Sequence, residues 1–235
     1  MPFIRPGINT PGTSLSLGAN NFRADISGDA ANTDPALVVV SGTTAGSNRV
    51  IFVGGGFAEM ADPTHSIAGT ITKRGTDQGF AGGLWPGFGW RAYTTPNAAS
   101  GGSYTVSVDK DNAFPLGEIS ISVLECIGGS SFVQSQGNVA GAGAGVGYSS
   151  PSITVTGPAV IYALWSGDGD TPVNPKDVAV SGTGWSLLQT AFISNTSYVQ
   201  FAVASRIVSS AGSYSCTWTP VTNQGAVMHM VAVVT

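Results

Sequence analysis

Apolar and polar residues alternate along several short stretches of this chain. Residues 119–123 read Ile-Ser-Ile-Ser-Val, a pattern typical of a β-strand with one buried face. Residues 103–108 alternate in the same way, and the turn-rich segment 109–116 separates the two stretches, so we expect a hairpin. A second hairpin is predicted near the C-terminus, from 212–218 into 227–233.

These patterns recur at a constant distance along the sequence. Tyr214 follows Tyr104, and Val233 follows Val123, by 110 positions in each case (214 − 104 and 233 − 123). The apolar run 160–163 corresponds to 50–53 at the same offset. Because a repeated unit commonly buries its apolar face against its copy, we expect each half to supply one sheet of a single two-layer antiparallel β-sandwich. Two tandem immunoglobulin-like domains are the alternative.

The predicted organisation separates an N-terminal arm from the sandwich. The arm spans residues 1–35, the first half 36–126 and the second half 151–235. Between the halves, 127–150 is rich in glycine and alanine, which indicates either a linker or a long loop. Within the first half, the segment 49–53, in which Arg49 precedes the apolar run 50–53, predicts a strand that is buried on both faces.

The arm contains three early prolines, Pro2, Pro6 and Pro11, which make it extended and non-helical. It can be read as a loose terminus or as a strap that orders against a neighbouring subunit. Under the second interpretation the residues that make the assembly contact are Phe3, Ile4, Arg5 and Ile8.

The composition supports an all-β protein and argues against several classes of function. Charged residues make up 9% of the chain and hydrophobic residues 42%, with 33 glycines and 13 prolines. The net charge of −4 and the scattered basic residues argue against nucleic-acid binding. Apolar runs fall short of the ~20 residues of a membrane span, and the first residues lack the features of a signal peptide. The two cysteines are expected to be unpaired thiols, one of them buried.

An aromatic, glycine-rich stretch covers residues 79–90, and the corresponding part of the second half, 192–201, contains no tryptophan. Tryptophan faces stack on sugars or fill pockets of protein partners, so this stretch is a candidate contact surface. The alternative is that its aromatic side chains belong to the core. The candidate contact residues are Phe80, Trp85, Phe88 and Trp90.

A glycine-rich stretch in the second half carries three aspartates, Asp168, Asp170 and Asp177. Calcium prefers oxygen ligands, which makes this stretch a weak candidate for a metal site. The spacing of an EF-hand and its closing glutamate are missing, so we expect neither a metal nor another cofactor.

The sequence offers few groups for catalysis. Its three glutamates are Glu59, Glu118 and Glu125. The last two lie seven positions apart on one predicted strand, on opposite faces and about 23 Å apart at ~3.3 Å per residue, too far to act as a glycosidase pair. His229 alternates within an apolar strand, which favours a hydrogen-bonded core histidine, and neither it nor His65 has a serine or cysteine motif to serve. We therefore expect that the chain is not an enzyme.

Three stretches carry a resemblance to a known group of proteins. Residues 48–54, 102–108 and the ending 211–218 into 231–234 resemble jelly-roll modules related to the concanavalin-like sandwiches, found in tailed-phage structural proteins and large bacterial surface proteins. The resemblance covers about residues 36–235. It implies a jelly-roll-like sandwich that is usually non-enzymatic and serves attachment or decoration.

From these observations we expect a structural or attachment protein of a phage or phage-like particle, such as a decoration, spike or tail-fibre-associated sandwich. Its expected partners are other particle subunits, as a homo-oligomer or repeated assembly, together with host-surface polysaccharide. The expected location is the virion, assembled in the host cytoplasm, with no nucleic-acid or membrane partner. A secreted carbohydrate-binding module is the alternative, and a sandwich-fold glycoside hydrolase is disfavoured by the missing carboxylate pair.

Overall fold

The computed structural model describes residues 14–25, 37–43, 46–56, 62–67, 69–79, 89–96, 102–109, 118–142, 144–169, 178–192 and 199–235. Every regular element in these residues is a β-strand, and every strand pair is antiparallel. Within the same residues, no helix is long and apolar enough to cross a membrane. The predicted all-β antiparallel class is confirmed.

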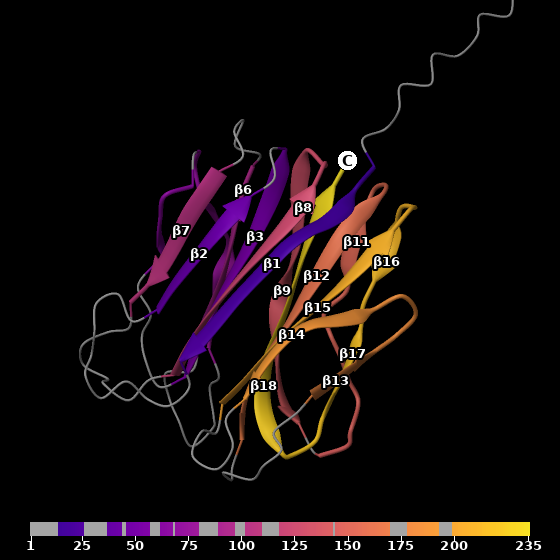
Figure 1. The fold of residues 1–235 in the computed structure, drawn as a ribbon. Helices are drawn as coiled ribbons and strands as arrows, with labels where there is room; N and C mark the ends of the chain where they lie inside the picture. The colour runs from indigo at the N-terminus through magenta and orange to yellow at the C-terminus, as the bar shows by residue number, and fades with distance from the viewer. Residues whose placement is uncertain are drawn as a thin grey trace, which may run out of the picture.

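The first half contains a five-stranded sheet and a smaller sheet (Figure 1). The five-stranded sheet has the order β1-β8-β3-β6-β5, with β1 Ser16–Asp25, β8 Glu118–Ile127, β3 Ser47–Gly56, β6 Gly89–Thr95 and β5 Thr72–Gly79. The smaller sheet has the order β2-β7-β4, with β2 Leu37–Thr43, β7 Gly102–Val108 and β4 Thr64–His65.

The second half repeats this arrangement. Its five-stranded sheet has the order β14-β15-β12-β18-β9, with β14 Ser186–Phe192, β15 Val199–Val208, β12 Ala159–Gly169, β18 Gln224–Val234 and β9 Ser131–Ala142. Its smaller strands form β10-β17-β13 and β11-β16, with β10 Tyr148–Ser149, β17 Thr217–Pro220, β13 Val178–Ser181, β11 Ile153–Val155 and β16 Gly212–Tyr214.

The described residues form three hydrophobic cores rather than one. In β3, Ile51 packs between the two sheets of the first half, whereas Val50 and Phe52 face the second half. In β12, Ile161 faces the small sheets of its own half and Val160 faces the first half. Each half is therefore a sandwich with its own core, and the two five-stranded sheets pack against each other through a third. The prediction that each half supplies one sheet of a single two-layer sandwich differs from this arrangement.

The repeat is confirmed by the order of the strands. At the 110-residue offset β3 corresponds to β12 and β8 to β18, and these occupy equivalent places in the two five-stranded sheets. Across the central core, β3 contacts its own equivalent β12, while β1 contacts β14 and β5 contacts β9. This reciprocal pattern is the one a two-fold axis produces between identical subunits, here within one chain.

Both predicted hairpins are wrong. β7 and β8 are consecutive along the chain but lie in different sheets. β18 pairs with β12 and β9 rather than with β16 or β17, which directly precede it along the chain. The alternation in β8 reflects two different cores, since Ser120 and Ser122 are 3% and 2% exposed. Their small side chains face the second half, where larger ones would separate the sheets.

Two segments that were not expected to be strands belong to the five-stranded sheets. Residues 16–25, assigned to the arm, form β1 and pair with β8 along the edge of the first sheet. Residues 131–142, expected as a linker or loop, form β9 and pair with the C-terminal strand β18. Glycine and alanine in β9 are compatible with a strand because the pairing with β18 supplies backbone hydrogen bonds.

Candidate functional site

The strands that flank the long connections end at one end of the molecule, which we call the connection end. In the first sheet Gly56 pairs with Glu118, and Gly79 with Gly89. These positions flank the segments 57–61, 80–88 and 110–117, whose own structure lies outside the described residues.

The second sheet places its long connections at the same end. Gly169 pairs with Gln224, and Asp168 with Val199, next to the segments 170–177 and 193–198. The two ends coincide because the ring of Phe201 lies directly against Gly54, close to the end of β3. Both stretches that the sequence singled out, the aromatic one and the aspartate-bearing one, are thus attached to the connection end.

Of the four candidate contact aromatics, only Trp90 lies within the described residues. Its side chain is 0% exposed and belongs to the central core. The centroid of its indole lies 4.0 Å from that of the His229 ring. Trp90 is therefore a core residue rather than a contact residue, because β6 turns it toward the second half. Phe80, Trp85 and Phe88 lie outside the described residues.

His229 was expected to be a hydrogen-bonded core histidine, and it is buried at 1% exposure. Neither ring nitrogen has a hydrogen-bond partner among the described residues. Burial lowers the pKa of His229 from 6.5 to about 3. The imidazole is therefore neutral at physiological pH and is enclosed by aromatic rings, including that of Phe52 at 6.3 Å between centroids.

A buried hydrogen-bond chain braces the connection end in the second half. The Trp165 indole Nε1 donates to Gln224 Oε1 at 3.0 Å, and Gln224 Nε2 donates to Gln200 Oε1 at 3.3 Å. The Gln224 amide occupies the space that a side chain at Gly167 would need. This chain ties β12, β18 and β15 together immediately before the segment that contains Asp170 and Asp177.

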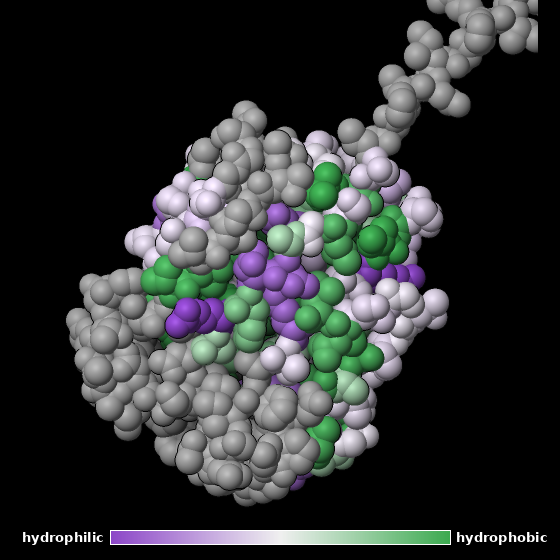
Figure 2. Space-filling model, in the orientation of Figure 1, coloured by the Kyte–Doolittle hydropathy of each residue, from purple (hydrophilic) through white to green (hydrophobic). Residues whose placement is uncertain are grey.

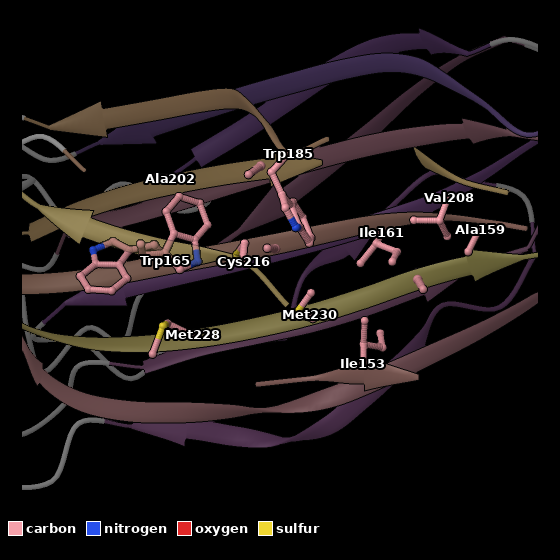
Figure 3. Close-up of a cluster of buried hydrophobic side chains, with 14 of the residues drawn as sticks. Ile153, Ala159, Ile161, Trp165, Trp185, Ala202, Val208, Cys216, Met228 and Met230 are labelled. Carbon is pink, nitrogen blue, oxygen red and sulfur yellow. The ribbon is translucent and has the colours of Figure 1, made fainter. Parts of the chain in front are cut away.

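The core beside this chain is formed by large side chains from several strands. Figure 3 shows Trp165, Cys216 and Met228 within this cluster, and the ring centroids of Trp165 and Trp218 lie 6.2 Å apart. Such packing holds the strand ends in fixed positions, which is what connections that carry binding residues require.

The candidate metal residues cannot be assembled into a site from the described part of the chain. The backbone of Asp168 lies in β12, and its side chain, like Asp170 and Asp177, lies outside the described residues. Among the side chains that the structure does describe, no group of three His, Cys, Asp or Glu residues could hold a metal ion.

Of the glutamates and histidines considered for catalysis, the structure places Glu125, His65 and His229 in three different layers. Glu125 is buried in the first half, with its Oε1 3.7 Å from Nε of Arg49, while the guanidinium of Arg49 lies 5.2 Å from the centroid of the Tyr104 ring. His65 is exposed in β4, far along the sequence from Glu125 and in the outer sheet. Glu59 and the side chain of Glu118 lie outside the described residues.

Both cysteines are free, so the prediction of unpaired thiols is confirmed. Both are also buried, Cys126 as well as Cys216, whereas only one was expected to be. Burial raises the pKa of Cys126 from 9.0 to about 12 and that of Cys216 to about 11. A thiol is a poor nucleophile when it is protonated and enclosed, so these side chains serve packing.

The Arg49–Glu125 pair is a feature that sequence reasoning missed. Both residues were assigned to apolar strands, and the repeat replaces them with Ala159 and Thr235 (49 + 110 and 125 + 110). That loss of both charges in the second half was the available signal, since removing only one member of a buried ion pair would leave the other charge uncompensated. The arm residues Phe3, Ile4, Arg5 and Ile8 lie outside the described residues.

Comparison with known proteins gives no match: no family model fits the chain, and neither a curated protein nor a solved structure was found to resemble it.

Proposed function

We propose that this chain is a non-catalytic structural and attachment protein of a phage or phage-like particle, and that it binds host-surface glycans through its connection end. The observation that carries the proposal is the combination of a rigid double sandwich with long connections attached at one end. This is the general arrangement of binding proteins, in which a fixed scaffold presents variable segments.

The chemistry of the described side chains favours binding over catalysis. The carboxylate of Glu125 is engaged with Arg49 in a core, and both thiols are buried and protonated. By contrast, the segment 80–88 carries Phe80, Trp85 and Phe88 and connects the paired ends of β5 and β6. Aromatic side chains on such a support stack on the apolar faces of sugar rings.

The proposal is tested with the purified chain on a glycan array, comparing the wild type with Trp85→Ala. We expect the wild type to bind a defined group of surface polysaccharides and Trp85→Ala to lose at least about tenfold in affinity, with little change in melting temperature. Ile207→Ala is the matched control, because Ile207 is 52% exposed and pairs with Val160 at the opposite end of the sheet. Its binding should equal that of the wild type.

A chain that binds no glycan but sediments as an assembly would leave decoration of the particle as its task. A monomer at all concentrations that also binds no glycan would contradict the proposal. Loss of about 3–5 kcal/mol of stability in Trp85→Ala would place that side chain in a core and remove it from the binding surface.

A further inference from the structure

One open sheet edge, that of β14, lacks the usual protection against pairing with another strand. β14 pairs with β15 on one side only among the described strands. It carries no charged residue, and Leu187 is 41% exposed on it. Its equivalent edge strand in the first half, β5, carries Lys73, Arg74 and Asp77, which is how natural edges are kept from pairing.

A second observation on β14 points to a missing partner. Gln189 is 9% exposed, and neither its Nε2 nor its Oε1 has a hydrogen-bond partner among the described residues. Buried amides are rarely left unpaired, because an unmet donor or acceptor costs about 1–3 kcal/mol. Gln189 is paired with Val203, which belongs to the central core, so its side chain lies on the face toward the first half.

β14 lies along the seam between the two halves, beside the first described strand. β1 and β14 are in contact, and a small cavity of about 10 Å³ between them is lined by residues that include Leu17, Tyr162 and Leu188. Figure 2 shows this face of the molecule, where apolar and polar surface lie side by side. Leu17 is 37% exposed here, and on β14 the residue that lines the cavity beside it is Leu188.

Both strands begin at the end opposite the connection end. Ser16 of β1 is paired with Ile127, and Ser186 of β14 with Ser205, which in turn faces Tyr162 near the start of β12. The chain that precedes β1 therefore arrives beside the start of β14. A strand that approaches from the connection end would run antiparallel to β14 before it entered β1.

The sequence before β1 has the pattern of a one-sided edge strand. In residues 2–9 the even positions are Pro2, Ile4, Pro6 and Ile8, which would form one apolar face. In a strand the N–H groups of alternate residues point to the same side, so both prolines would turn their missing N–H away from the partner. Phe3, Arg5, Gly7 and Asn9 would donate toward it, and Pro11 would end the pairing.

The length of the connection agrees with this placement. Residues 10–13 can span about 13 Å when extended, and packed sheets lie about 10 Å apart. This is enough to carry the chain from the edge of the second sheet to the start of β1 in the first.

We propose that residues 2–9 add to the open edge of β14 in the same chain, as an antiparallel sixth strand of the second five-stranded sheet. The added strand covers Leu187 and places Arg5 and Asn9 on the side from which Gln189 projects. It also links the two halves across their seam, since the segment continues directly into β1.

The test is hydrogen exchange of the full-length chain, followed by mass spectrometry of peptides that cover residues 2–9 and 186–192. We expect both peptides to exchange at least about tenfold more slowly than unstructured chain. Gly7→Pro should abolish the protection of both, because it removes an N–H that must pair. Ile8→Pro is the matched control, since its N–H points away, and it should keep the protection.

Three results would overturn the proposal. Residues 2–9 could exchange at the unstructured rate in the wild type, or the two proline variants could behave alike. Protection that disappears on dilution, together with a dimer in sedimentation, would mean that the segment comes from a second copy. The glycan binding proposed above does not depend on any of these results.

Discussion

One close contact between the two halves is made by a glycine. A Cβ atom placed on Gly54 would lie 2.7 Å from Cε1 of Phe201 and 3.1 Å from Oγ of Ser120. The Phe201 ring from the second half thus rests on the backbone of β3, and any side chain at Gly54 would push the sheets apart. Gly54 is required by this close approach and not by an unusual backbone angle.

We predict that Gly54→Ala destabilises the protein by about 1–3 kcal/mol, the usual cost of overpacking a core. Urea unfolding monitored by tryptophan fluorescence measures this effect. Gly157→Ala is the control, because its added methyl would lie 3.7 Å from Oγ1 of Thr235, an ordinary contact distance. Phe201→Leu should recover part of the loss in the double variant, and equal effects of the two alanine substitutions would contradict the packing described for Gly54.

His229 makes the stability of the protein depend on pH. The pKa of His229 is about 3 in the folded chain and 6.5 in the unfolded chain. Between these two pH values the imidazole is therefore protonated in the unfolded state and neutral in the folded state. The free energy of unfolding is therefore unaffected by His229 above pH 6.5 and decreases as the pH falls from 6.5 toward 3. The difference of 6.5 − 3 sets an upper bound of roughly 5 kcal/mol on the loss.

The effect of His229 is isolated by comparing the wild type with His229→Met over this pH range. Carboxylates contribute to both proteins alike, so the difference between the two curves should grow as the pH falls. Curves that stay parallel would show that the imidazole accepts a proton without unfolding, for example through a hydrogen bond formed in solution.

At the scale of the strands, the sequence predicts where strands lie better than it predicts which strands pair. The alternating stretches 103–108 and 119–123 are strands, and the run 50–53 is buried on both faces, as its unbroken apolar character indicates. The pairing of β7 with β8 fails because a connection of 109–117 can cross between sheets as readily as it can turn within one. Adjacency along the chain does not distinguish these two cases.

The burial of serine explains why the sequence does not predict the layer between the two five-stranded sheets. Ser120 and Ser122 look like the exposed face of a half-buried strand, yet they are buried where the two five-stranded sheets meet. A polar residue as small as serine fits a close sheet interface as well as it fits water. The same ambiguity concealed β1 and β9, whose asparagine, glycine and alanine residues are typical of loops but lie at sheet edges.

The candidate site was predictable only in part. The repeat separates features needed by both halves from features present in one, and it singles out the aromatic stretch 79–90. Most of that stretch lies outside the described residues, so its role as a contact surface stays a prediction. It could not show that Trp90 turns inward, because whether a residue at the start of a strand faces the core depends on register. Nor could it place the Trp165–Gln224–Gln200 chain, whose members are far apart in the sequence.

At the scale of the whole molecule, the two halves are arranged like the subunits of a two-fold dimer fused into one chain. The central core takes Phe52 and Leu124 from the first half and Tyr162 and Val231 from the second, all at most 2% exposed. The Tyr162 hydroxyl also donates to the backbone oxygen of Glu125 at 3.0 Å. Separating the halves would expose this entire layer to water, so neither is expected to be stable alone.

Differential scanning calorimetry of the full-length chain tests this account most directly. If the central core couples the two sandwiches, the chain unfolds in a single transition whose calorimetric and van't Hoff enthalpies agree. Two resolved transitions, or a calorimetric enthalpy well above the van't Hoff value, would mean that the halves unfold independently. That result would contradict the central claim that the two sandwiches form one cooperative body.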